Sequence, residues 1–163
     1  MTSNEEQSRI NELLQQEIHI SRQLLGILQS ENQALSSNDH DAIRRLIPNK
    51  QQAIDTLGSL AQQRQSLLKN AGFSEDKKGM EAFIRQCGLM SRDLLEQYWR
   101  QLGTAASACQ RQNEINGIII SASSRYTKNA LSILKGQRPG NELHYGPNGE
   151  KISTANSTTF AKA

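Results

Sequence analysis

Aliphatic residues recur at steps of three and four over three long stretches of this chain, and this spacing limits what the chain can fold into. Residues with that spacing lie on one face of an α-helix, so each stretch predicts a long amphipathic helix. We therefore expect an all-α fold, an elongated antiparallel hairpin or bundle of long helices. The stretches are 3–36, about 39–70 and 91–135, and their stripes include Ile10, Leu14, Leu24, Leu28, Ile43, Leu57, Leu60, Leu68, Leu95, Leu102, Ile119 and Leu134.

Local signals mark where these helices begin and end. Ser3 and Glu6 have the spacing of a capping box at the start of the first helix. The Ser-Ser-Asn-Asp sequence at 36–39 provides a break and the cap of the next helix. Gly72 is placed to end that second helix, and a further cap then predicts a short helix over about 74–86.

Two positions leave alternatives open. Pro48 interrupts the second stretch, so it should either kink that helix or end one helix and begin another. Around Gly88 the apolar spacing does not decide whether the chain bends or continues as a helix.

Composition sets the size of the core and the limits of the folded part. Aromatic residues make up only 4% of the chain, which indicates a narrow, aliphatic core. Beyond residue 136 apolar groups are few and Gly, Asn, Ser and Thr are frequent. Such a segment buries too little surface to offset the entropy of ordering it. The sequence therefore predicts a helical domain over 1–136 and a flexible, disordered tail over 137–163.

Several features place the chain in the cytoplasm. No apolar run approaches the roughly 20 residues that span a bilayer, and the N-terminal MTSNEEQ is too acidic and polar for a signal peptide. Cys87 and Cys109 are the only cysteines, and we expect two free, buried thiols. We predict no membrane insertion, no metal site and no cofactor.

The chain carries little that indicates catalysis. No Gly-rich phosphate loop precedes a helix, and no Ser or Cys nucleophile has a base nearby, so we expect a protein that is not an enzyme. His19, in the middle of a predicted helix, raises the alternative of phosphotransfer. Its neighbourhood, Glu-Ile-His-Ile-Ser-Arg, has no Lys or Gly one turn on, which favours an ordinary surface histidine.

The last predicted helix has an uneven charge and two polar residues in its apolar stripe. Residues 99–138 carry six basic residues and one acid, Glu114. The basic residues are widely spaced, which favours a solvated face over an acidic protein partner and disfavours nucleic acid. Asn113 and Asn116 either form a polar layer that sets helix register or face a partner.

The C-terminal half of the sequence resembles the FlgN-type flagellar export chaperones. The similarity consists of an Asn-x-x-Asn motif followed by aliphatics, a later Asn followed by leucines, and a Tyr-Gly-x-x-Gly motif. These features comprise Asn113, Asn116, Ile118, Ile119, Asn129, Leu134, Tyr145, Gly146 and Gly149. Upstream the match is looser, at Glu17, Leu24, Asp41, Leu46, Lys50, Leu57, Arg64 and Trp99.

The resemblance implies a cytoplasmic chaperone for the flagellar hook–filament junction proteins, hook-associated proteins 1 and 3. Such a chaperone prevents premature assembly and delivers its substrates to the cytoplasmic domain of the type III export gate. The implied substrate surface is the end of the last helix and the partner-binding tail, with candidates Ile119, Ile120, Tyr126, Leu131 and Leu134. The implied export-gate docking residues are Tyr145, Gly146 and Gly149, in a sequence that favours a turn.

An alternative from another class is a helical structural adaptor or coiled-coil assembly factor without an export role. For such a protein the first two predicted helices would suffice.

Overall fold

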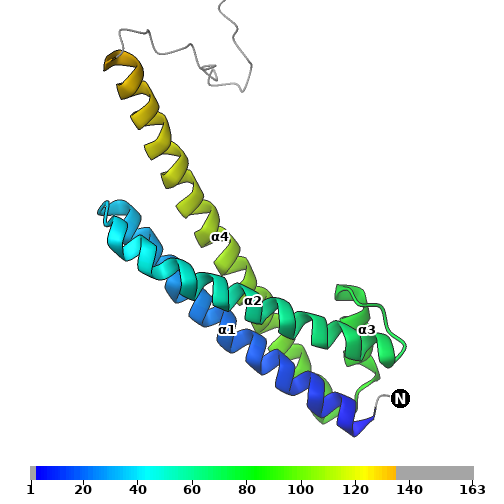
Figure 1. The fold of residues 1–163 in the computed structure, drawn as a ribbon. Helices are drawn as coiled ribbons and strands as arrows, with labels where there is room; N and C mark the ends of the chain where they lie inside the picture. The colour runs from blue at the N-terminus through cyan, green and yellow to red at the C-terminus, as the bar shows by residue number, and fades with distance from the viewer. Residues whose placement is uncertain (1–2, 135–163) are drawn as a thin grey trace, which may run out of the picture. The chain divides into compact units, whose positions relative to one another are not determined.

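Four α-helices form the part of the chain that the structure, a computed structural model, describes, residues 3–134 (Figure 1). They are α1 (Asn4–Ser36), α2 (His40–Asn70), α3 (Lys77–Gln86) and α4 (Leu89–Leu134). These residues include no strand, and the predicted all-α fold is confirmed. The chain divides into two compact units, Met1–Ser121 and Ala122–Ala163, and the described part of the second unit is 122–134.

α1 begins and α2 is capped where the sequence predicts. The Ser3 hydroxyl accepts a hydrogen bond from the Glu6 backbone N–H at 3.2 Å, and the Glu6 carboxylate accepts one from the Ser3 N–H at 2.8 Å. The capping box is therefore closed. Between the helices Asn38 has a positive φ of 55°, and Asp39 Oδ1 accepts a hydrogen bond from the Ala42 N–H at 2.9 Å. This short connection reverses the chain.

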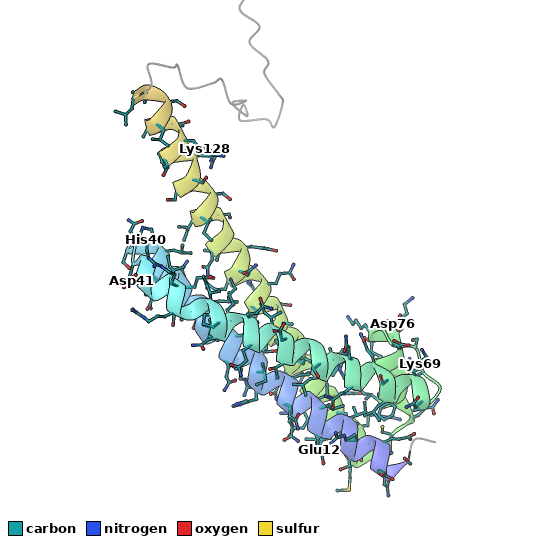
Figure 2. All side chains as sticks on the ribbon, viewed as in Figure 1. Glu12, His40, Asp41, Lys69, Asp76 and Lys128 are labelled. Atoms are coloured by element: carbon teal, nitrogen blue, oxygen red, sulfur yellow. The ribbon has the colours of Figure 1, made fainter. Side chains whose placement is uncertain are left out.

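α2 is one continuous helix through Pro48, so the alternative in which Pro48 ends one helix and begins another is wrong. Proline has no N–H for the carbonyl of Arg44, but both residues are exposed, and water can solvate that group. Figure 2 shows His40 at one end of α2 and Lys69 at the other. The helix is followed by Gly72 at φ +83°, the left-handed conformation predicted for a glycine just past a helix end.

α3 is a short helix that begins after Asp76. Asp76 Oδ1 accepts hydrogen bonds from the Gly79 N–H at 2.9 Å and the Ser74 hydroxyl at 2.6 Å. At Gly79 an added Cβ would lie 1.7 Å from the Ser74 carbonyl oxygen, so no larger residue fits. Cys87 and Gly88 separate α3 from α4, which shows that the chain breaks here and does not continue as a helix.

Two ion pairs define how α1 and α2 are paired. Lys50 binds Glu31 at 3.0 Å, and Arg64 binds Glu17 at 2.7 Å. The later residue of α2 meets the earlier residue of α1, so the two helices run antiparallel, and Figure 1 shows them side by side. The predicted antiparallel pair of long N-terminal helices is therefore present.

α4 runs parallel to α1 within the first unit. The Cys109 thiol donates to the Ser21 carbonyl oxygen at 3.2 Å, and Asn116 Nδ2 donates to the Leu28 carbonyl oxygen at 2.8 Å. Both pairs are 88 residues apart in the sequence. A constant separation means that residue numbers rise together along the two helices.

The core of the first unit is narrow and mainly aliphatic. One buried cluster lies where α3 packs against the long helices, and a second lies further along α1. Cys87 and Cys109 are both buried thiols that form no disulfide within the described residues, as predicted. No helix in the described range has a stretch that is long and apolar enough to cross a membrane. The first cluster consists of Ile10, Leu14, Ile18, Leu68, Met80, Phe83, Ile84, Cys87, Leu95 and Leu102, and the second of Leu24, Leu28, Ala53 and Cys109.

Candidate functional site

α4 packs into the core through a line of residues seven positions apart. Its buried residues are Leu95, Leu102, Cys109 and Asn116. A seven-residue repeat is typical of helices that wind around one another in a coiled coil. Along this line the side chains change from leucine to cysteine to asparagine. The apolar packing of α4 thus ends in a polar contact at the last buried position in its described residues.

Asn116 forms that polar contact and is only 1% exposed. Its Nδ2 donates to the Leu28 carbonyl oxygen and to Glu31 Oε2, both at 2.8 Å. Its Oδ1 accepts from Asn32 Nδ2 at 3.0 Å and from Gln112 Nε2 at 3.1 Å. The predicted polar layer between helices is therefore confirmed for this residue.

The same layer extends to α2 through Lys50, whose Nζ lies 3.0 Å from both carboxylate oxygens of Glu31. Three helices therefore meet in one hydrogen-bonded network. Sliding α4 along α1 would leave buried polar atoms without partners, which is costly. The network therefore fixes the register of α4. Asn113, the other asparagine of the motif, is exposed and lies outside it.

A second buried ion pair lies closer to α3. Arg64 Nε and Nη2 donate to the two oxygens of Glu17 at 2.7 and 3.2 Å. The Arg64 guanidinium also lies over the Trp99 ring, 5.0 Å from its centroid. Arg64 thus joins α2 to α1 and α4. Three upstream residues of the resemblance, Glu17, Lys50 and Arg64, hold the helices together.

The Glu17–Arg64 pair lines a groove of about 830 Å³ in the first unit. Small residues on α2 and α4, Ala61, Gly103 and Ala106, leave part of this space unfilled. Its other lining combines Leu57, Ile84, Trp99 and Leu102 with charged residues such as Lys77 and Glu96, and the apolar part can accept apolar side chains. Sequence analysis did not predict the groove. The one sequence signal for this groove was a pair of small residues on α4, Gly103 and Ala106. That signal cannot be interpreted without knowing which helix lies opposite them.

In the first unit α4 exposes aliphatic side chains close to Asn116. Ile115, Ile118 and Ile120 are exposed, and Ile118 is 68% exposed. Of the two predicted substrate residues here, Ile120 is exposed and Ile119 is half-buried. Their part in substrate binding stays a prediction.

In the second unit residues 122–134 of α4 are also rich in exposed apolar side chains. The predicted residues Tyr126, Leu131 and Leu134 are exposed, Tyr126 by 77% and Leu134 by 83%. Ile133 is exposed as well and was missed by sequence analysis, as was Ile115, and Ile118 was named there only as part of the family motif. These three belong to the same aliphatic-rich sequence, and a count of all its apolar residues would have included them.

The predicted gate-docking residues Tyr145, Gly146 and Gly149 lie outside the described residues. Within the described range no group of three His, Cys, Asp or Glu side chains is arranged to hold a metal ion. His19 is exposed on α1, as expected for a surface histidine.

Comparisons with known proteins agree with this arrangement. A family model described as FlgN protein matches residues 1–152. The chain is also similar to a solved structure of a proposed flagella synthesis protein FlgN from Pseudomonas aeruginosa, with 29% identity and a TM-score of 0.60. That similarity covers 76% of this chain and 93% of the other. No curated protein matches the chain.

Proposed function

Since the chain belongs to the FlgN family of flagellar export chaperones, we propose that it holds hook-associated proteins 1 and 3 in the cytoplasm. In this proposal it prevents their premature assembly and delivers them to the cytoplasmic domain of the flagellar export gate. It does so by binding alone, without catalysis or a cofactor. The observation that supports the proposal most directly is the exposed apolar surface of α4.

Exposed aliphatic and aromatic side chains close together on one helix are unusual in a protein with no partner. In the second unit α4 exposes Tyr126, Ile133 and Leu134, each by more than half. A helix with such a surface can bind an amphipathic segment of another protein. A chaperone needs a surface of this kind, because it must cover an apolar segment of its substrate and release that segment later.

The proposed substrate surface consists of Ile119, Ile120, Tyr126, Leu131 and Leu134, to which we add Ile118 and Ile133. Full burial of one such side chain is worth about 1.5–3 kcal/mol. Several of them together suffice for a specific complex even after the entropic cost of association.

A binding measurement with the full chain and a C-terminal fragment of a hook-associated protein tests this surface. Tyr126→Ser combined with Leu131→Ser should weaken binding by about tenfold or more. The matched control is Ile54→Ser, which removes an exposed isoleucine from α2, and it should leave the affinity unchanged. Equal loss in both variants, or no binding by the unaltered chain, would refute the proposed surface.

The tail is proposed to contribute to substrate capture. A chain ending at Lys135 should therefore bind the fragment more weakly than the full chain. Equal affinities would remove the tail from this role.

Docking to the export gate is proposed to depend on Tyr145, with Gly146 and Gly149 shaping a turn that presents its ring. Tyr145→Ala should weaken binding to the cytoplasmic domain of the gate and leave substrate affinity unchanged. An unaltered gate affinity would show that Tyr145 has no docking role.

A further inference from the structure

Along the line of α4 residues that packs on α1 the side chains become polar or small, while other positions of the same helix keep large apolar residues. Leu95, Leu102, Cys109 and Asn116 form the buried line. The same seven-residue step continues in the sequence to Ser123 and Ala130. These are a small polar and a small apolar residue, which offer little surface for helix packing. The core-facing line of α4 is therefore unsuited to bind a further helix.

A different set of α4 residues has the spacing expected of a seam for another helix. In the second unit Ala122, Tyr126, Asn129 and Ile133 follow steps of four, three and four. This is the alternation by which one helix packs against a second in a coiled coil. Tyr126 and Ile133 are exposed, Asn129 is an exposed polar residue in this line, and Ala122 is half-buried. The spacing therefore suits a helical partner better than an extended one.

The charges beside this seam all have one sign. From Ile115 to Leu134 the only charged residues are Arg125 and Lys128, which flank Tyr126, and the last acid before them is Glu114. Both cations are exposed, and Figure 2 labels Lys128 on α4. Within the described residues neither forms an ion pair or a side-chain hydrogen bond.

Some exposed cations in the first unit pair with nearby carboxylates. Arg9 binds Glu12 at 3.0 Å, and Lys69 binds Glu75 at 3.2 Å. The end of α4 has no acid with which to do so. Two cations that pair with no carboxylate of the described residues lie beside an apolar seam, and they complement a partner that brings carboxylates to the same place.

We infer that the segment bound by the end of α4 is an amphipathic helix whose apolar face is bordered by Asp and Glu. The inference rests on the proposed function and adds the chemical class of the bound segment. Two cations are too few for a nucleic-acid site, where several phosphates are usually neutralised. They are also a weak attraction for an anionic membrane, at about 1 kcal/mol for each basic residue.

Two synthetic peptides of about 20 residues, long enough to form a helix, test the inference on the full chain. Both carry the same Leu and Ile face, one bordered by Glu and the other by Lys. The Glu peptide should bind about tenfold more tightly at low salt, and high salt should reduce the difference. Similar affinities for the two peptides, or no binding of either, would overturn the inference.

Reversing the charge of Arg125 and Lys128 tests whether these two residues cause the preference for the Glu peptide. Arg125→Glu combined with Lys128→Glu should reverse the preference between the peptides. Arg44→Glu combined with Arg45→Glu, which reverses two exposed cations on α2, should leave it intact. If both double variants change the preference equally, the general charge of the protein is responsible, and the inference is wrong.

The same variants separate this inference from the proposed function. If the hook-associated fragment binds the full chain and reversal at α4 does not alter its affinity, the proposed function stands and the acidic border is refuted. If the fragment does not bind, the proposed function fails, and the peptides decide the inference alone. A third outcome is that the chain binds vesicles with anionic lipid, loses this binding in the Arg125→Glu and Lys128→Glu double variant, and binds both peptides equally. That outcome would assign the surface to a membrane and overturn the inference.

Discussion

Removing the carboxylate of Glu17 should destabilise the first unit more than any change at an exposed ion pair. The Glu17 and Arg64 side chains are only 5% and 10% exposed, and two hydrogen bonds join them. A guanidinium group keeps its positive charge in proteins. In Glu17→Ala the Arg64 guanidinium would remain buried beside Trp99 without a counter-ion.

The expected loss in the free energy of unfolding of Glu17→Ala follows from this geometry. Breaking a buried pair by removing one partner costs about 3–5 kcal/mol, because the remaining charge is uncompensated. A domain of this size is stable by only about 5–15 kcal/mol, so the loss is a large part of the total. Glu17→Leu combined with Arg64→Met removes both charges and keeps apolar volume. That double variant should have nearly the stability of the original chain, or exceed it.

Urea unfolding followed by circular dichroism at the helix band measures these free energies, and constant slopes check that unfolding stays two-state. The control is Glu12→Ala, which breaks the Arg9–Glu12 pair on the same helix, where both side chains are 53% exposed. It should cost at most about 1 kcal/mol. If Glu17→Ala costs no more than this control, or if the double variant is as unstable as Glu17→Ala, the reasoning is refuted.

Three further predictions concern single positions. Gly79→Ala should destabilise α3, because the added Cβ would lie 1.7 Å from the Ser74 carbonyl oxygen. Gly58→Ala should stabilise α2 by about 0.5–1 kcal/mol, because its added Cβ would have no atom within 4 Å. Thermal unfolding of the two variants compares these effects. Hydrogen bonds from the Ser74 hydroxyl and the Gly79 N–H lower the pKa of Asp76. The stability that the ionised Asp76 contributes is therefore fully present above the ordinary pKa of an aspartate, near 4. It is lost as the pH falls through the lowered pKa of Asp76 in the folded chain. Asp76→Asn should abolish that part of the acid dependence, which amide exchange in α3 followed against pH would detect. Burial raises the pKa of the Cys109 thiol, so a thiol reagent at mildly alkaline pH should modify it slowly in the folded chain and rapidly in urea; equal rates would contradict its buried position.

Helix positions and ends could be predicted because they depend on residues close together in the sequence. The capping box of Ser3 and Glu6 spans three residues, and Gly72 ends α2 through its own backbone conformation. The effect of Pro48 on α2 could not be predicted, because the local signal of a proline is the same for a kinked helix and for a helix that ends. The missing N–H of Pro48 disfavours the helix, but α2 continues on both sides and the unpaired carbonyl of Arg44 can be solvated.

The candidate site was only partly predictable. Sequence spacing and resemblance pointed to the apolar end of α4, where Tyr126 and Leu134 are indeed exposed. They could not separate Asn113 from Asn116, because both lie on the same stripe three residues apart. Only the rotation of α4 against α1 decides that Asn116 is buried and Asn113 is not.

The sequence by itself determined that the described chain is helical, where most of its helices begin and end, and which segment has more apolar residues than its core can use. Each of these follows from interactions over a few positions, which the order of residues specifies directly. The tertiary structure alone decided that Glu17 meets Arg64 and Glu31 meets Lys50, that α4 runs parallel to α1, and that small residues leave a groove beside Trp99. Such pairings depend on the register and rotation of whole helices, which many weak contacts set together and no short stretch of sequence encodes.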